Sequence, residues 1–211
     1  MIQLYAITDC PGPPLPDIAS LRAIATRELV AVCAPVEGHE VTSEVLWRYE
    51  QVVEALMDDR DVLPVRYGTR VPDEAAAARV LEANYDQLAE RLEFVRGAAE
   101  LSVRVLVQGR PSPRKVRGRA SSGSEYLRAR ARETTAEADA VRAVHAPLSA
   151  AARATSLRTP GLSGEILRAA YLVDHERVES YGRLMAELQD ANSALRLTCT
   201  GPWPPYSFAQ R

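Results

Sequence analysis

The sequence of 211 residues has little cysteine, a single lysine and no long hydrophobic run. Its three cysteines, Cys10, Cys33 and Cys199, lie far apart. No CxxC pair is present, so neither a zinc knuckle nor a disulfide framework is indicated. We expect buried, inert thiols in a reducing compartment.

Signals that would send the chain into or across a membrane are also missing. No apolar stretch approaches the roughly 20 residues that a helix needs to cross a bilayer. The first residues, MIQLYAITDCPGP, lack the charged start and long apolar stretch of a secretion signal. We therefore expect the protein to stay in the cytoplasm.

Catalytic and cofactor-binding motifs are absent as well. The sequence has no GxGxxG, GxxxxGK[ST], GxSxG or HExxH. No two of the three histidines, His39, His145 and His175, are four residues apart, as a helical metal pair requires. We expect no cofactor, no metal, no small-molecule substrate and no catalytic residue. A small-molecule enzyme or sensor remains an alternative, which a polar pocket with perturbed titrating groups would support.

Charge divides the chain into two halves. Residues 1–100 carry 18 acidic and 9 basic side chains, a net charge of −9, whereas the remainder carries 10 and 17, a net charge of +7. Such an asymmetry is typical of two domains with different surfaces. We expect an N-terminal α+β domain over residues 1–98 and a second domain over residues 99–211.

The first half shows strand and hairpin patterns. Residues 2–8 and 61–67 are β-prone and short, and each predicts a strand. Residues 22–35 carry β-prone runs on either side of Arg27-Glu28, which indicates a hairpin.

Two helices are expected in the same half. The first covers residues 39–59, and either Thr42 or Ser43 is a suitable cap. The second begins near Pro72 and ends at Gly97, which favours a left-handed backbone. Its apolar residues recur at intervals of four and three, which indicates a core-facing stripe: Leu81, Tyr85, Leu88, Leu92 and Val95.

The second half predicts a regular order of elements. Apolar and polar residues alternate over 101–108, which is typical of a half-buried strand. A helix over 124–146, a hairpin over 151–173, a helix capped by Asp174 and a strand over 195–200 follow. The order β-α-β-β-α-β is that of the ferredoxin-like split βαβ arrangement. The sequence therefore predicts an α+β fold class, with the ferredoxin-like domain second.

The segment 104–132 is strongly basic, with nine basic residues against one acidic residue, Glu125. Much of this charge lies in a Pro/Gly/Ser-rich loop, which we expect to meet an acidic protein surface. Its candidate partner-binding residues are Arg114, Lys115, Arg117 and Arg119. The alternative is a nucleic-acid-binding module that uses this segment for phosphate contacts. The strand over 101–108 carries no exposed aromatic residue for base stacking, which weighs against that alternative.

The last residues, 201–211, form a tail rich in proline and aromatic residues. Prolines fix an extended backbone, and Trp203, Tyr206 and Phe208 supply large apolar surfaces. The tail is either a strap that packs across its own domain or a strip that binds a partner. We retain the three aromatic residues as candidate partner-binding residues.

The tail also carries a resemblance. The segment LTCTGPWPPYSFA at 197–209 resembles the closing signature of the GvpF/GvpL family of gas vesicle proteins. Other segments agree in order and spacing, and the resemblance thus spans the chain. They are LYAIT at 4–8, VLPVRYGT at 62–69 with Tyr67 in place of the commoner Phe, ELSVRVLV at 100–107, YLRARARE at 126–133 and AAYLVD at 169–174.

The resemblance implies a role in building gas vesicles, the protein shells that give microbes buoyancy. It implies a minor structural or accessory protein that binds the small hydrophobic shell protein and other accessory proteins during assembly. Apolar shell subunits aggregate if they are unprotected, so covering them is a plausible task. The expected location is the gas vesicle within the cytoplasm, with no nucleic acid and no membrane as a partner. The resemblance implies two α+β domains and no catalytic residue.

Overall fold

The chain folds into two compact units, Met1–Glu100 with Pro202–Arg211, and Leu101–Gly201. The computed structural model describes residues 1–9, 12–36, 41–108 and 123–209, with side chains in 123–134 excepted. Among these residues, no helix is long and apolar enough to cross a membrane.

A five-stranded sheet forms the centre of the first unit. Its strands β2 (Arg22–Thr26), β3 (Leu29–Pro35), β1 (Ile2–Asp9) and β4 (Leu63–Pro64) follow in that order, and β5 (Arg70–Val71) also pairs with β1. β2 and β3 form the hairpin predicted from the sequence. The strand predicted over 61–67 is reduced to the two residues of β4.

The helices of the first unit differ in extent from those predicted. α1 (Ser43–Met57) is shorter than 39–59, and Thr42 caps it by accepting a hydrogen bond from the Val45 N–H at 3.2 Å. The single helix expected between Pro72 and Gly97 is two, α2 (Glu74–Ala83) and α3 (Tyr85–Val95).

The break between α2 and α3 has a local cause. Asn84 has φ −121° and ψ 15°, outside the helical region. Its side-chain Nδ2 donates to the Val80 carbonyl at 2.8 Å. This bond replaces the one that the Asn84 backbone N–H would make to the same carbonyl in a continuous helix. Asparagine competes with the helix backbone in this way, which is why it favours helix ends.

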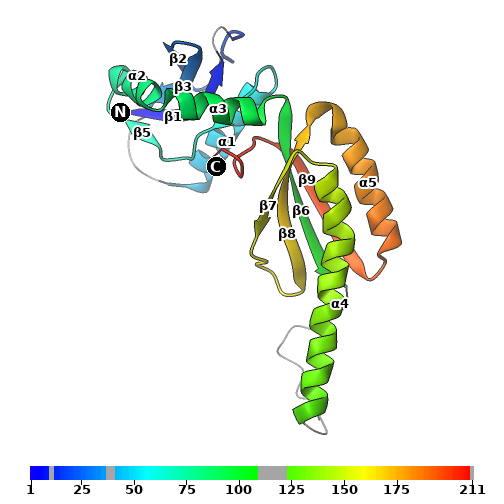
Figure 1. The fold of residues 1–211 in the computed structure, drawn as a ribbon. Coiled ribbons are helices and arrows are strands. Elements are labelled where there is room, and N and C mark those ends of the chain that lie inside the picture. Colours follow the sequence, from blue (N-terminus) through cyan, green and yellow to red (C-terminus); the bar gives the residue numbers. More distant parts are fainter. Residues whose placement is uncertain (10–11, 37–40, 109–122, 210–211) are drawn as a thin grey trace. The chain divides into compact units, whose positions relative to one another are not determined.

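Both faces of the first sheet are covered. β3 is buried along nearly its whole length, as expected for a strand enclosed on two sides. On one face, Val52 and Leu56 of α1 pack against Val30, Val32 and Ala6. α2 and α3 contact the sheet as well, on the other side in Figure 1.

The second unit has the element order that the sequence predicted, β-α-β-β-α-β. Its elements are β6 (Ala98–Val107), α4 (Gly123–Ala150), β7 (Ala154–Arg158), β8 (Glu165–Asp174), α5 (Val178–Ala191, after a short 3₁₀ turn) and β9 (Leu195–Trp203). The strands form a four-stranded sheet in the order β7-β8-β6-β9. β7 and β8 are the predicted hairpin.

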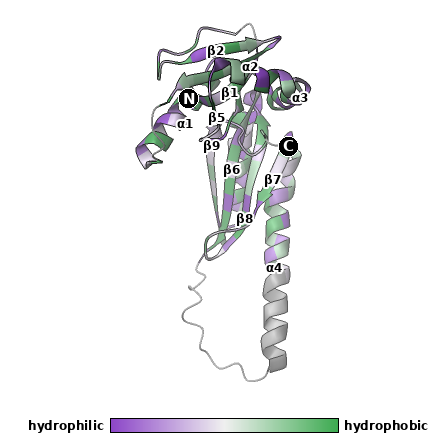
Figure 2. Ribbon diagram, turned by 90° about the vertical axis from the view of Figure 1, so that its left-hand side faces the viewer, coloured by the Kyte–Doolittle hydropathy of each residue, from purple (hydrophilic) through white to green (hydrophobic). Residues whose placement is uncertain are grey.

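Among the described residues, α4 and α5 pack against one face of this second sheet. Alternate residues of β6 and β8 pack with Val144 and Leu148 of α4 and with Tyr181 and Met185 of α5. Figure 2 shows hydrophobic and hydrophilic residues following one another along the strands. The residues between the core positions therefore lie on the face opposite the helices.

The tail differs from the domain assignment made from sequence. Residues from Pro202 onward belong to the first unit, whereas the sequence placed 201–211 with the second domain. Ser207 explains the difference, because its N–H and hydroxyl donate to the two carboxylate oxygens of Glu100 at 2.8 and 2.7 Å.

Candidate partner-binding groove

A groove of about 640 Å³ runs beside α1 in the first unit. Its walls come from β1, from α1 and from the segments before β2, after β3 and after β4. The lining is mostly apolar or aromatic: Gln3, Tyr5, Ile18, Ala19, Val36, Val45, Arg48, Tyr49, Gln51, Val52, Ala55 and Tyr67. A groove of this size and character is typical of a surface that binds an apolar group.

Three tyrosine rings give the groove a rigid side. Tyr5 and Tyr49 stack with their centroids 4.8 Å apart, and Tyr49 meets Tyr67 edge-on at 5.2 Å. Both geometries are those that aromatic pairs prefer. The rings therefore hold their positions before any partner arrives, which reduces the entropy cost of binding.

The Tyr49 hydroxyl anchors α1 to the sheet. It donates toward backbone carbonyls of Leu4, Tyr5 and Val65. Burial, followed by the neighbouring Glu50 charge, raises the pKa of Tyr49, so the phenol stays neutral and keeps its proton for these contacts. The Tyr67 hydroxyl is buried and has no hydrogen-bond partner among the described residues. It is thus a polar group that a ligand in the groove could satisfy.

Large apolar side chains lie exposed around the groove. Trp47 is 62% exposed and lies one helical turn before Gln51 of the lining, on the adjoining strip of α1. Ile18, part of the lining itself, is 37% exposed. An exposed tryptophan next to an apolar groove is typical of a protein-binding surface.

The predicted tail residues occupy different environments. Phe208 is fully buried, whereas Trp203 is 40% exposed. The Tyr206 ring is partly buried, and burial raises the pKa of its hydroxyl, with the Tyr49 and Glu50 charges adding to the rise. Phe208 thus shapes the first unit from within, and of the three only Trp203 presents a large exposed surface.

Local turns set the path of this tail. The N–H groups of Phe208 and Ala209 both donate to the Pro205 carbonyl, at 3.0 and 3.1 Å. Arg91 of α3 donates to the Ala209 carbonyl at 3.5 Å. These contacts, with the Ser207–Glu100 pair, make the tail a strap across the first unit.

The predicted basic residues fall outside the described part of the chain. Arg114, Lys115, Arg117 and Arg119 all lie in 109–122. Arg104, at the start of the basic segment, is described and lies on β6 in the second unit.

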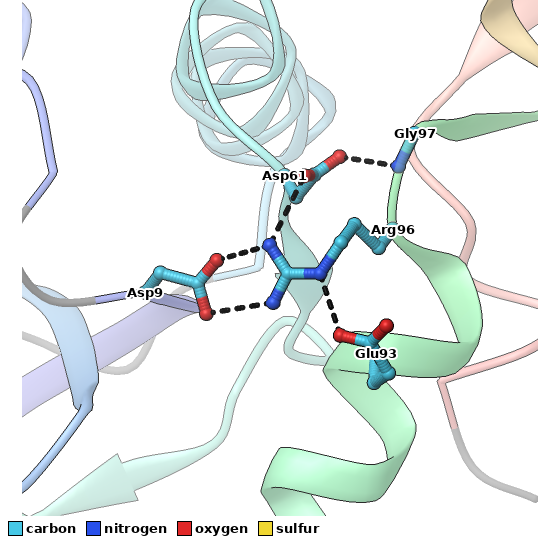
Figure 3. Close-up of polar contacts among 5 residues, drawn as sticks. All are labelled: Asp9, Asp61, Glu93, Arg96 and Gly97. Carbon is cyan, nitrogen blue, oxygen red and sulfur yellow. Dashed lines mark hydrogen bonds and ion pairs between the residues drawn. The ribbon is translucent and has the colours of Figure 1, made fainter.

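Arg96 is the centre of an ion cluster in the first unit (Figure 3). Its guanidinium donates to both oxygens of Asp9 and to Glu93, and it lies 3.6 Å from Asp61. Asp61 in turn accepts from the Gly97 N–H at 2.6 Å. These hydrogen bonds, Asp9 first, raise the pKa of Arg96. The cluster ties β1, the loop before β4 and the end of α3 together, so its role is structural.

Metal ligands do not converge in the described part of the molecule. No group of three or more His, Cys, Asp or Glu side chains there could hold a metal ion. His145 instead hydrogen-bonds the Tyr171 hydroxyl at 2.8 Å, inside the second unit.

Sequence reasoning missed the groove and its tryptophan. Trp47 lies between Leu46 and Arg48 in a helix whose buried residues are Tyr49, Val52, Val53 and Leu56. A large apolar residue off the buried face was the available signal. The lining, however, comes from segments up to 64 positions apart, Gln3 and Tyr67 among them, which no local pattern connects.

Comparisons with known proteins agree with this structure. A family model described as gas vesicle synthesis protein GvpL/GvpF matches residues 2–210. Gas vesicle protein L of Streptomyces sp. is 32% identical over 197 residues, covering 83% of this chain and 73% of that relative. Gas vesicle protein F2 of Halobacterium salinarum is 26% identical over 191 residues, covering 88% and 78%.

A solved structure shares the fold. The crystal structure of the gas vesicle protein GvpF from Anabaena aligns with a TM-score of 0.80 at 18% identity, covering 100% of this chain and 98% of that one. The likeness shows a mixed α+β fold with two sheets.

Proposed function

The chain belongs to the gas vesicle GvpL/GvpF family, and from that premise we propose that it binds the gas vesicle shell protein during assembly and keeps it from aggregating. It does so at the gas vesicle, within the cytoplasm, together with other accessory proteins. In this proposal the chain recognises and protects the shell protein and catalyses no reaction.

The groove beside α1 is the observation that carries this proposal. It is apolar, it has a preorganised aromatic side, and Trp47 stands exposed beside it. Leaving a tryptophan 62% exposed places a large apolar surface in water. A partner that covers Trp47 and fills the groove recovers that free energy.

The physical task of a shell subunit fits such a surface. A subunit that will form a gas-tight wall must carry apolar surface before it assembles, and exposed apolar surface drives aggregation. A soluble protein that covers part of this surface lowers the concentration of exposed subunits by mass action. The tail acts as the strap that supports the first unit, and Trp203 is a further exposed aromatic residue that a partner can cover.

Co-expression of the shell protein with this chain tests the proposal. We expect the wild-type chain to raise the soluble fraction of the shell protein, and Trp47→Ala to abolish most of that effect. Truncating a central aromatic contact weakens binding by about tenfold or more. Leu157→Ala is the matched control, because Leu157 is 63% exposed but lies on β7 of the second unit.

The outcome can contradict the proposal in two ways. Equal shell-protein solubility with and without the chain would remove the protective role. Equal loss in the Trp47 and Leu157 variants would remove the groove as the binding surface. The thermal midpoint of each purified variant, expected to match the wild type within about 2 °C for an exposed side chain, excludes misfolding as the cause.

A further inference from the structure

The face of the second sheet opposite the helices carries a second, chemically different surface. A hollow of about 290 Å³ crosses all four strands. Its lining includes three arginines and three hydroxyl side chains: Arg104, Arg158, Arg168, Ser102, Thr198 and Thr200. Each of these six side chains can donate hydrogen bonds. The surface is therefore suited to a ligand that is negatively charged and accepts hydrogen bonds.

Two of the arginines are placed against each other. Arg158 of β7 and Arg168 of β8 are directly opposite in the strand register. Like charges at such a position destabilise a sheet. A bound anion would offset this cost, since it attracts both guanidinium groups at once.

One buried carboxylate supports the arginines from inside. The Glu165 side chain is only 1% exposed, and its Oε1 lies 3.9 Å from Arg104 Nε. Its other oxygen accepts from the N–H groups of Gly161 and Leu162 at 2.5 and 3.0 Å. Burial alone would raise the pKa of Glu165, but these two N–H groups and the charges of Arg168 and Arg104 together lower it. Glu165 therefore stays ionised and helps to position the guanidinium groups.

The side chains that line the hollow carry three positive charges and no negative charge. Three arginines face one carboxylate, and that carboxylate does not line the hollow. Arg142, Arg177 and Arg183 of the same unit do not line the hollow. The positive charge is thus concentrated on the sheet face.

We propose that this arginine face, defined by Arg104, Arg158 and Arg168, is a docking site for an acidic protein segment. Guanidinium groups bind carboxylates in paired, parallel hydrogen bonds, and the neighbouring hydroxyl groups complete the coordination. Nucleic acid is the less suitable occupant, because no aromatic side chain lines the hollow on which a base could stack. With the groove on the first unit, the chain then offers an apolar surface and a basic surface to two different partners.

Fluorescence anisotropy with a labelled octaglutamate peptide tests the site on the full-length protein at low salt. We expect binding that weakens as salt rises. The triple variant Arg104→Gln, Arg158→Gln, Arg168→Gln should lose about tenfold or more in affinity. The matched control Arg142→Gln, Arg177→Gln, Arg183→Gln removes the same charge from the same unit and should stay within about twofold of the wild type, since its arginines are in exposed pairs.

Each alternative result overturns the proposal. Absence of octaglutamate binding, or equal loss in both triple variants, would show that no specific site exists. Tighter binding of a labelled eight-nucleotide single-stranded DNA, lost in the same triple variant, would assign the face to nucleic acid. Displacement of octaglutamate by millimolar inorganic phosphate with equal efficiency per charge would assign it to free anions.

Two further measurements distinguish loss of the arginine face from loss of the fold and from loss of the groove. Arg158→Gln alone, at an exposed position on an edge strand, should weaken octaglutamate binding, and the thermal midpoint of the purified variant shows whether the fold is kept. Trp47→Ala should leave octaglutamate binding unchanged. The arginine face and the groove can therefore fail independently.

Discussion

Cys33 is a buried, free thiol in the centre of β3. Burial, with a contribution from the Glu74 charge and opposed by Arg22, raises the pKa of this thiol from 9.0 to about 11. In the unfolded chain the thiol loses its proton at a lower pH than in the folded chain. The stability that depends on Cys33 is therefore complete below pH 9 and is lost as the pH rises toward 11.

Comparison with Cys33→Ala measures this loss. Between pH 7 and pH 10, the wild type should lose about 1 kcal/mol more of its free energy of unfolding than the variant does. Urea unfolding at the two pH values gives the difference. Cys10, Cys199 and the tyrosines are common to both proteins, so their titration cancels. An identical pH dependence in both proteins would contradict the expected shift.

Phe208 and Trp203 make a matched pair of tail aromatics. Phe208 is fully buried and Trp203 is 40% exposed. Phe208→Ala should lower the free energy of unfolding of the first unit by about 3–5 kcal/mol, because it leaves a cavity in the core. Trp203→Ala should cost less than half as much, and chemical denaturation measures both. Equal costs would mean that the strap does not depend on Phe208 in particular.

The sequence identified these aromatics as important but not which of them is buried. Burial of Phe208 depends on a strap held by Glu100, 107 positions away from Ser207. Local patterns reach only across a turn or a strand pair. The candidate binding residues in the tail were therefore predicted as a group, and their separate environments required the structure.

At the scale of the element, prediction was most accurate where a single period governs a whole segment. The β2–β3 hairpin follows from two β-prone runs, β6 from alternation, and the β7–β8 hairpin from turn residues. The α2–α3 break was missed because the apolar stripe continues through it. Leu81 of α2 and Leu92 of α3 are both 1% exposed, so the pattern predicted one helix where Asn84 makes two.

The start of α1 provides a test at this scale. The sequence left Thr42 and Ser43 as alternative caps, and the structure assigns the role to Thr42, whose Oγ1 accepts from the Val45 N–H at 3.2 Å. Thr42→Ala should lower the free energy of unfolding by about 1 kcal/mol. Ser43→Ala, one residue later and inside the helix, should cost less or raise stability, because alanine is the better helix former. The opposite order in urea unfolding would move the cap to Ser43.

At the scale of the whole molecule, each of the two units contains a cluster of buried apolar residues of its own. The first unit is built from residues far apart in the chain, 1–100 and 202–211, and the second from the residues between them. A chain that ends at Gly201 lacks Phe208 and the partner of Glu100. It should lose amide hydrogen-exchange protection in β1 and β3 of the first unit, while β6 and β8 keep theirs.

The second unit supplies the control for that truncation. Among the described residues, its core cluster includes Val103, Tyr171 and Tyr181 and contains no residue after Gly201. Hydrogen exchange followed by mass spectrometry resolves the two sheets in one experiment. Equal loss of protection in both sheets would show that the units unfold as one.

The strap also orders events in time. A ribosome makes Pro202 and the residues after it only when the whole of the second unit has already been synthesised. The core that contains Phe208 therefore closes last, although most of its residues are translated first. A nascent chain should accordingly complete the core of its second unit before Phe208 can enter the core of the first.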